Sequence, residues 1–191
     1  MESIKFKLPI PPSVNKAYGL RVQYMGGKAI PQRYLTHTAK EYKEYVSSTC
    51  KRLMKENNIK FLVENKDEFV HMEFIFYFDK KRKDAHNTFK LLFDGIVQSG
   101  LIVDDDVILY EVKDIYIDRL NPRVEVKISK SKKKGIFKTE DDLNKFLNIN
   151  CIDCKRYKRY KGNCSILRKA LENRIEPEIN KDEYICIEKK S

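Results

Sequence analysis

Alternating apolar residues and helical apolar periodicity divide the first part of the chain into strands and helices. Alternation predicts strands over Ile4 to Leu8, Phe69 to Phe78 and Val124 to Ile128. The apolar face of the second strand consists of Val70, Met72, Phe74, Phe76 and Phe78. A helix is predicted from Thr38 to about Met54, with an apolar stripe that includes Tyr42, Tyr45, Val46 and Leu53. This order predicts an α/β domain in which helices pack on a mixed β-sheet.

A second helix is predicted to begin near Phe89 and to end before Gly100. Its apolar positions follow the i, i+3, i+4, i+7, i+8 pattern and are Phe89, Leu92, Phe93, Ile96 and Val97. Asp84 can cap the helix, and glycine suits the left-handed residue that ends one. β-branched and aromatic residues predict a strand over Val107 to Val112. The stretch from Tyr18 to Leu35 contains turn residues and predicts a hairpin or loop.

The second helix also has a polar face. His86, Lys90 and Asp94 are spaced i, i+4 and i+8, and Asn87 lies beside them. The positive end of the helix dipole lies near Asp84, where it favours anionic groups. Side chains able to bind a metal ion or a phosphate therefore gather at the start of this helix.

Charged runs flank the same helix. The basic run Lys80 to Lys83 precedes it, and the acidic run that follows it consists of Asp104, Asp105 and Asp106. If the strand after Gly100 packs on the helix, the first two of these aspartates return close to Asp84 and His86. Hard oxygen ligands beside a phosphate-attracting patch are what metal-assisted phosphodiester chemistry requires. The arrangement favours a nuclease.

Each feature alone has an ordinary explanation. An aspartate before a helix is usually a cap, and three aspartates at a turn are usually a solvated loop. A histidine or lysine in the first helical turn is usually a solvated side chain. The joint arrangement favours a site, because a cap does not need three more acids at the other end of the helix.

The net charge agrees with a nucleic-acid partner. The chain carries a formal charge of +11 at pH 7. Basic residues concentrate at Lys80 to Lys83, Lys130 to Lys134 and Lys155 to Lys161, the last interleaved with Tyr157 and Tyr160. One such run is as often a solvated surface, whereas three runs, one of them beside the acids, favour DNA. Binding through DNA phosphates should weaken steeply with salt.

The sequence contains no membrane or secretion signal. No apolar run approaches the roughly 20 residues of a membrane-spanning helix. Ile4 to Pro9 alternates like a strand and lacks the apolar core of a signal peptide. We therefore expect a cytoplasmic protein with no membrane partner, whose cysteines are reduced or metal-bound rather than paired in disulfides.

Two motifs resemble a known family. The pattern Asp84-x-His86-Asn87-x-x-Lys90-x-x-x-Asp94, followed by Gly100 and Asp104-Asp105, resembles the RusA family of Holliday junction resolvases and phage endonucleases. Leu8 to Asn15, LPIPPSVN, is similar to the family's N-terminal strand and PPSxN turn. The resemblance covers roughly residues 1 to 130. It implies a homodimer in a bacterial or phage-infected cell that cuts branched DNA, such as four-way junctions, using Mg²⁺ or Mn²⁺.

The resemblance also implies roles for individual residues. By position, Asp84 and Asp105 would be metal ligands and Lys90 the catalytic lysine. His86 stands where the best-known members have a third aspartate. Because imidazole suits Mn²⁺ or Zn²⁺ better than Mg²⁺, we expect some preference for Mn²⁺. Asp104 or Asp106 could supply the missing carboxylate, and His86 and Asp104 are the further candidate ligands.

The expected reaction is phosphodiester hydrolysis. Metal-bound water would attack the scissile phosphate, and Lys90 would offset charge that develops in the transition state. The family resemblance implies products with 5′-phosphate and 3′-hydroxyl ends. DNA contacts are expected at Asn15, Lys16, Lys80, Lys81, Arg82, Lys83 and Asn87.

Two other functions remain open. The first is a branched-DNA-binding protein on the same scaffold, catalytically impaired because His86 displaced a ligand. The second is RNA binding, suggested only by the interleaved tyrosines and lysines. Asp84, Lys90 and Asp105 favour the nuclease, because acids beside phosphates repel DNA unless a cation intervenes.

The domain organisation follows from a change in composition. We expect a nuclease domain at 1–130, a basic linker at 131–145 and a small cysteine-rich module at 146–191. Ser129 to Gly135 reads SKSKKKG, which is typical of a flexible linker.

The cysteine-rich module has the spacing C-x₂-C-x₉-C-x₂₁-C, formed by Cys151, Cys154, Cys164 and Cys186. A C-x₂-C pair closed by distant cysteines is typical of structural zinc, with the helix from Ser165 to Asn173 packed over the metal. An iron–sulfur cluster uses the same four thiolates. Cys186 also fits a strand with a buried thiol. Cys50, in the first helix, is expected to have no chemical role.

Overall fold

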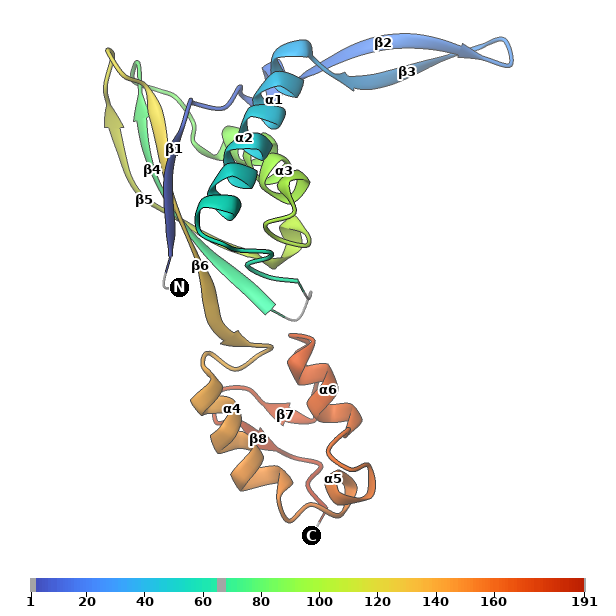
Figure 1. The fold of residues 1–191 in the computed structure, drawn as a ribbon. Helices are drawn as coiled ribbons and strands as arrows, with labels where there is room; N and C mark the ends of the chain where they lie inside the picture. The colour runs from blue at the N-terminus through green and yellow to red at the C-terminus, as the bar shows by residue number, and fades with distance from the viewer. Residues whose placement is uncertain (1–2, 65–67, 191) are drawn as a thin grey trace. The chain divides into compact units, whose positions relative to one another are not determined.

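The structure is a computed structural model that describes residues 3–64 and 68–190. The chain forms two compact units, one made of Met1–Glu64 and Val70–Ser129 and the other of Asn65–Phe69 and Lys130–Ser191. Figure 1 follows the chain through both. No helix in the described residues is long and apolar enough to cross a membrane.

A four-stranded sheet forms the framework of the first unit. Its strands are β1 (Ile4–Leu8), β4 (Glu68–Phe78), β5 (Ile108–Ile117) and β6 (Arg123–Lys134), in the order β1-β6-β4-β5. β1 pairs antiparallel with β6, and β4 pairs parallel with β5, so the sheet is mixed as the sequence predicts. The predicted bounds of β1 are confirmed.

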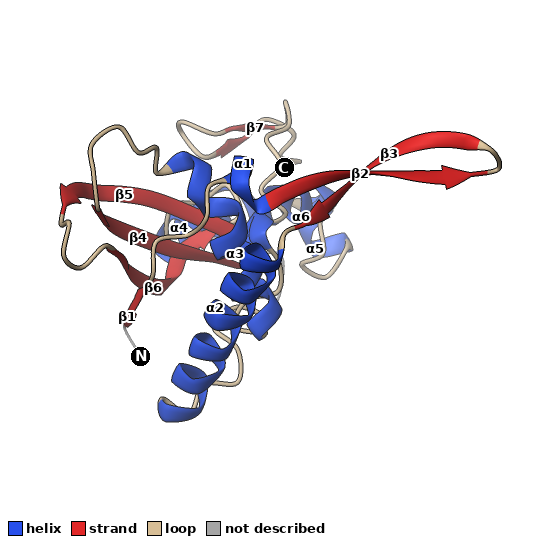
Figure 2. Cartoon of the chain, turned by 90° about the horizontal axis from the view of Figure 1, so that it is seen from above, coloured by secondary structure: helices blue, strands red, loops and turns tan. Residues whose placement is uncertain are grey.

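Two helices cover one face of this sheet, as Figures 1 and 2 show. They are α2 (His37–Glu56) and α3 (Phe89–Ser99). The predicted apolar face of β4 is buried beneath them, and so are Val46 of α2 and Ile96 of α3. Gly95 allows the helices to approach closely, because a Cβ there would lie 2.7 Å from the Val46 Cβ.

The predictions for α3 and its surroundings are largely confirmed. The helix ends at Gly100, which has the expected left-handed conformation with φ 81°. A 3₁₀ turn, η1 (His86–Thr88), precedes the helix, and another, η2 (Asp105–Val107), leads into β5. β5 continues to Ile117, five residues beyond the predicted end of that strand.

The stretch predicted as a hairpin or loop is a hairpin. A short helix, α1 (Val14–Ala17), leads into β2 (Tyr18–Met25), which pairs antiparallel with β3 (Lys28–Leu35). Both ribbon views show the hairpin extending away from the sheet and helices of its unit. Most of its side chains are exposed, so its hydrogen-bonded ladder rather than a core holds it together.

The expectation of a flexible linker at Ser129 to Gly135 is wrong over most of that stretch. β6 continues through it as far as Lys134. The Lys130 Nζ lies 2.6 Å from Glu68 Oε1, and the Lys133 ammonium lies 4.6 Å from the centre of the Phe69 ring. Partners on β4 thus fix lysines that composition alone assigns to a solvated linker.

The second unit consists of short elements. They are α4 (Glu140–Phe146), a π-helical turn η3 (Leu147–Cys151), α5 (Lys155–Arg159), α6 (Ser165–Leu171), β7 (Ile179–Asn180) and β8 (Ile185–Cys186). Thr139 and Asp142 form a capping box at the start of α4, which places a helix inside the stretch expected to be linker. The predicted helix after Cys164 is present as α6, and Cys186 lies in a strand. Buried residues of this unit include Phe137, Phe146, Cys151, Cys164 and Leu167.

Candidate active site

Asp84 holds the turn that opens the candidate site. Its Oδ1 accepts a hydrogen bond of 2.8 Å from the His86 backbone N–H, and its Oδ2 accepts one of 2.8 Å from Asn87 Nδ2. The predicted cap is wrong, because the N-cap residues are Ala85 for η1 and Thr88 for α3, and Asp84 instead holds the turn before η1. Each of its carboxylate oxygens retains a second lone pair, which leaves acceptor capacity for a cation or a proton donor.

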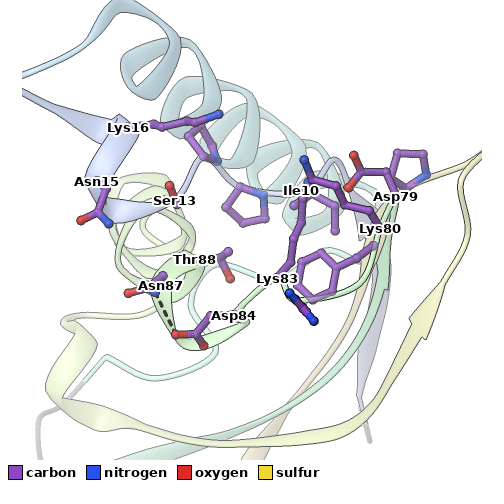
Figure 3. A pocket seen from close by; sticks show the side chains of 15 residues that line it. Ile10, Ser13, Asn15, Lys16, Asp79, Lys80, Lys83, Asp84, Asn87 and Thr88 are labelled. Atoms are coloured by element: carbon purple, nitrogen blue, oxygen red, sulfur yellow. Dashed lines mark hydrogen bonds and ion pairs between the residues drawn. The ribbon is translucent and has the colours of Figure 1, made fainter.

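An open groove of about 620 Å³ lies beside Asp84. Figure 3 shows the PPSxN turn on one side and the Asp84–Asn87 turn and the basic run on the other. Six of the seven expected DNA contacts line the groove, namely Asn15, Lys16, Lys80, Arg82, Lys83 and Asn87. The seventh, Lys81, is exposed but is not among the residues that line it.

Lys90 links the helix to the acidic run. Its Nζ lies 2.9 Å from Asp94 Oδ1 and 3.1 Å from Asp105 Oδ2. The hydrogen bonds that Lys90 donates to Asp94 and then to Asp105 raise its pKa, so its ammonium stays protonated well above neutral pH. The i, i+4 contact with Asp94 follows from the helix, whereas the contact with Asp105 brings together residues 15 positions apart in the chain.

Asp104 and Asp105 occupy the turn after Ile102 and Val103. The Asp104 Oδ1 accepts the Asp105 backbone N–H at 2.8 Å and thereby caps η2. Both aspartates line a second pocket of about 290 Å³, which they share with Lys90 and Asp94. The acidic run is therefore an ordered turn against α3 and not a freely solvated loop.

The candidate residues thus form two groups. Asp84 and Asn87 line the groove, whereas Lys90, Asp104 and Asp105 line the second pocket. The His86 ring packs edge-on against the Phe89 ring, with 6.1 Å between the ring centres. In the described part of the chain, no three His, Cys, Asp or Glu side chains are grouped closely enough to hold a metal ion as they stand.

The four C-terminal cysteines lie around one small cavity of the second unit. Its volume is about 10 Å³, and Cys151, Cys154, Cys164 and Cys186 all line it. Cys50 is buried in the core of the first unit, where burial raises the pKa of its thiol to about 12 while a hydrogen bond with Ser99 acts in the opposite direction. That environment agrees with an inert core thiol.

Sequence reasoning missed one residue of this groove. Asp79 lines it, and Lys83 pairs with Asp79 and lowers the pKa of its carboxyl. Ser13, which belongs to the PPSxN motif, lines the groove as well. Asp94 lies on the predicted polar face, and its i, i+4 spacing from Lys90 predicts the observed contact. No local signal marks Asp79, because only the folded chain brings it to the groove.

Comparison with known proteins covers the first unit. Residues 9–129 match the family model described as endodeoxyribonuclease RusA. No curated protein matches the chain. The match includes the PPSxN turn, the basic run, α3 and the acidic turn, and it ends before the first cysteine of the second unit.

Proposed function

Because this chain belongs to the RusA endodeoxyribonuclease family and is a Holliday junction resolvase-type nuclease, we propose that Asp84, Lys90 and Asp105 carry its phosphodiester hydrolysis together with a divalent metal ion. The observation that carries the proposal is the contact between Lys90 Nζ and Asp105 Oδ2 at 3.1 Å. It brings Lys90, in the first turn of α3, into contact with Asp105 of the acidic turn, and the turn that contains Asp84 precedes α3 in the chain.

The residues fit a hard divalent cation by their chemistry. Asp84, Asp104 and Asp105 offer carboxylate oxygens, the ligands that Mg²⁺ and Mn²⁺ prefer. His86 would add one imidazole nitrogen. When bound, the ion supplies a water nucleophile of lowered pKa and stabilises negative charge on the phosphate. Asp84 can take part while it keeps both hydrogen bonds of its turn, because each of its oxygens has a lone pair left.

Lys90 acts as a fixed positive charge in this proposal. Its raised pKa excludes a role as general base at neutral pH, because the deprotonated amine is too scarce. A protonated amine can donate hydrogen bonds to a non-bridging phosphate oxygen, which becomes more negative as the nucleophile attacks. Asp94 holds the ammonium in place through the 2.9 Å contact and is therefore a positioning residue.

The groove would bind the DNA backbone next to the reacting phosphate. Lys80, Arg82 and Lys83 of the basic run and Lys16 of α1 line this groove, so its cationic side chains come from two segments. Phosphate contacts of this kind fix the position of a strand without reading its sequence. A structure-selective enzyme needs that kind of binding.

The presence of His86 predicts which metal ion supports faster cleavage. Exchanging a carboxylate for an imidazole removes one negative charge and favours a softer cation, so cleavage should be faster with Mn²⁺ than with Mg²⁺. The variant His86→Asp should raise cleavage with Mg²⁺ relative to Mn²⁺. An unchanged ratio of the two rates would remove His86 from the ligand set.

Two chains would act together on one junction. A four-way junction has twofold symmetry, and each chain offers one Asp84–Lys90–Asp105 set, so two symmetric cuts require a dimer. Light scattering of the free protein and of its junction complex measures this directly. Two chains per junction support the dimer, and one chain per junction rejects it.

The central experiment is cleavage of an end-labelled four-way DNA junction with Mg²⁺ and with Mn²⁺. We expect paired, symmetric nicks from the native chain and none from Asp84→Asn or Asp105→Asn, while Asp141→Asn, an exposed carboxylate of α4, cuts normally. Junction binding without cleavage in either metal would instead establish the binding protein that the presence of His86 suggests. Full cleavage by Asp105→Asn would contradict the proposed site.

A further inference from the structure

The four C-terminal cysteines come from three separate stretches of the second unit. Cys151 ends η3, and Cys154 immediately precedes α5. Cys164 precedes α6, and Cys186 ends β8. All four line the same small cavity, and the first three are buried. Cys164 and Cys186 thus lie at the same cavity although 21 residues separate them in the chain.

Backbone hydrogen bonds hold the segments that carry these cysteines. The Cys154 N–H donates to the Cys151 carbonyl at 3.0 Å, within the C-x₂-C pair. The Cys186 N–H donates to Asn150 Oδ1 at 2.9 Å, which ties β8 to η3 next to Cys151. The Lys155 backbone N–H also donates to the Lys190 carbonyl at 2.9 Å, which fixes the C-terminal stretch beside Cys154.

We propose that Cys151, Cys154, Cys164 and Cys186 bind one structural Zn²⁺ ion in this cavity. A C-x₂-C pair closed by two distant cysteines supplies the four thiolates of a tetrahedral site. The cavity of about 10 Å³ is the size of one small guest and leaves no room for substrate. The site is therefore structural, and it lies outside residues 9–129, which match the nuclease family.

The sulfur atoms would draw together when the ion binds. Zn–S bonds of about 2.3 Å in a tetrahedron place neighbouring sulfur atoms about 3.8 Å apart. Four thiolates repel one another at that spacing, and only a central cation offsets the repulsion. In residues 3–64 and 68–190 the cysteines, like all other His, Cys, Asp and Glu side chains, do not form a closed ligand group as they stand, so binding requires the sulfur atoms to move closer together.

Nearby cations would offset the charge of the filled site. Zinc with four thiolates carries a net charge of −2. Arg156 lines the cavity, and Lys189 donates a hydrogen bond of 2.8 Å to the Ile149 carbonyl, two residues before Cys151. Both positive charges lie on the segments that carry the ligands, although Arg156 also pairs at 3.6 Å with Glu188, which lines the same cavity.

The first experiment measures metal in the full-length protein purified without added metal or chelator. We expect about one zinc per chain by elemental analysis, and Co²⁺ exchanged into the protein should give the intense visible spectrum of a tetrahedral thiolate site. Iron together with acid-labile sulfide would contradict the assignment of zinc. A folded protein that contains no metal would contradict the proposal that these cysteines form a metal site.

Variants locate the metal within the chain. Cys154→Ser and Cys164→Ser should each lose the zinc and the cobalt spectrum, whereas Cys50→Ser, which removes the buried thiol of the first unit, should retain both. Zinc at one per chain in Cys154→Ser would reject the proposal. If a ligand variant fails to fold, the native chain can be tested instead by removing its metal reversibly with a chelator and titrating it with Co²⁺. A visible spectrum that does not change during this titration would reject the proposed site.

Discussion

The two units of this chain bury very different side chains. The core of the first unit is built from large apolar residues, with Phe74, Phe76 and Met72 of one strand fully buried under two helices. Apart from the ends of β4 and β6, the described part of the second unit has helices of seven residues or fewer and strands of two, and three of its buried side chains are cysteines. Apolar burial is enough to hold a domain of the first kind, whereas a small core of the second kind usually needs a metal or a disulfide.

The two units also differ in where their candidate functional side chains lie. In the first unit, Asp84, His86 and Lys90 are exposed on a scaffold that does not depend on them. In the second unit, the residues with chemistry belong to the core itself. Substitutions at the candidate nuclease site should therefore change activity with little effect on stability, and substitutions of the cysteines should do the reverse.

The largest effect should follow removal of metal from the second unit. Structural zinc sites stabilise small modules by roughly 10 kcal/mol, so chelation should unfold the second unit while the first remains folded. Hydrogen exchange followed by mass spectrometry checks this segment by segment. Amides of α4 and α6 should lose protection and those of β4 and α3 should keep it. Equal loss in both units, or loss in neither, would break the comparison.

A matched pair of core truncations tests the apolar half of the comparison. Phe76 and Phe137 are both fully buried, one in each unit. Phe76→Ala should lower the free energy of unfolding of the first unit by about 3–5 kcal/mol, through lost burial and the cavity left behind. Phe137→Ala should destabilise the second unit alone and leave the transition of the first in place. Chemical denaturation with two spectroscopic probes separates the transitions, and a shared shift would show that the units unfold together.

Asp94→Asn should alter catalysis without altering the fold. Loss of its carboxylate frees one side of the Lys90 ammonium, and we expect roughly a 10-fold slower cleavage with junction binding unchanged. The pKa of Lys90 should also fall, because Asp94 is the first cause of its elevation.

The pH dependence gives this variant a distinct signature. A lysine with a raised folded-state pKa contributes its stabilisation fully below its ordinary pKa, and the contribution is lost as pH rises through the folded value. Cleavage by the native chain should therefore resist alkaline pH, and Asp94→Asn should lose activity at a lower pH. If the cleavage rates of the native chain and of Asp94→Asn fall in the same way at alkaline pH, Asp94 is not a positioning residue.

The smallest effect concerns the basic groove. Lys80→Ala and Lys83→Ala should each weaken binding of every junction sequence alike and reduce the salt dependence of log K by about one per lost phosphate contact. Lys81→Ala serves as the control, because Lys81 is exposed outside the groove. Binding isotherms over a range of salt concentrations make the comparison, and equal slopes for all three variants would remove the groove as the DNA path.

Strong periodicity made the framework of the first unit predictable. The alternating face of β4 and the apolar stripe of α3 were identified correctly, because burial on one side imposes periods of 2 and 3.6 residues. The burial of two residues was predicted wrongly. Tyr45 lay in the predicted stripe of α2 but is 49% exposed, and Leu91 lay outside the predicted stripe of α3 but is buried.

Contacts between distant residues could not be read from sequence. The lysines of Ser129 to Gly135 look like a linker by composition, yet Glu68 and Phe69, some 60 residues earlier in the chain, draw them into β6. Likewise, the acidic run was predicted to return close to Asp84 and His86, but Asp105 contacts Lys90 and Asp84 lines a separate pocket. Local patterns predict elements, and long-range partners decide where their ends and side chains lie.

The most direct test of the proposed nuclease site replaces one non-bridging oxygen of the scissile phosphate with sulfur. A metal ion that contacts this oxygen should lose Mg²⁺-supported cleavage on substitution and regain it with Mn²⁺, which accepts sulfur more readily. Cleavage of mapped four-way junctions carrying each phosphorothioate isomer provides the measurement. We predict a strong loss with Mg²⁺ for one isomer and its rescue by Mn²⁺. Equal cleavage of both isomers and of the unmodified junction with Mg²⁺, or cleavage in excess chelator, would contradict a metal-dependent site at Asp84 and Asp105.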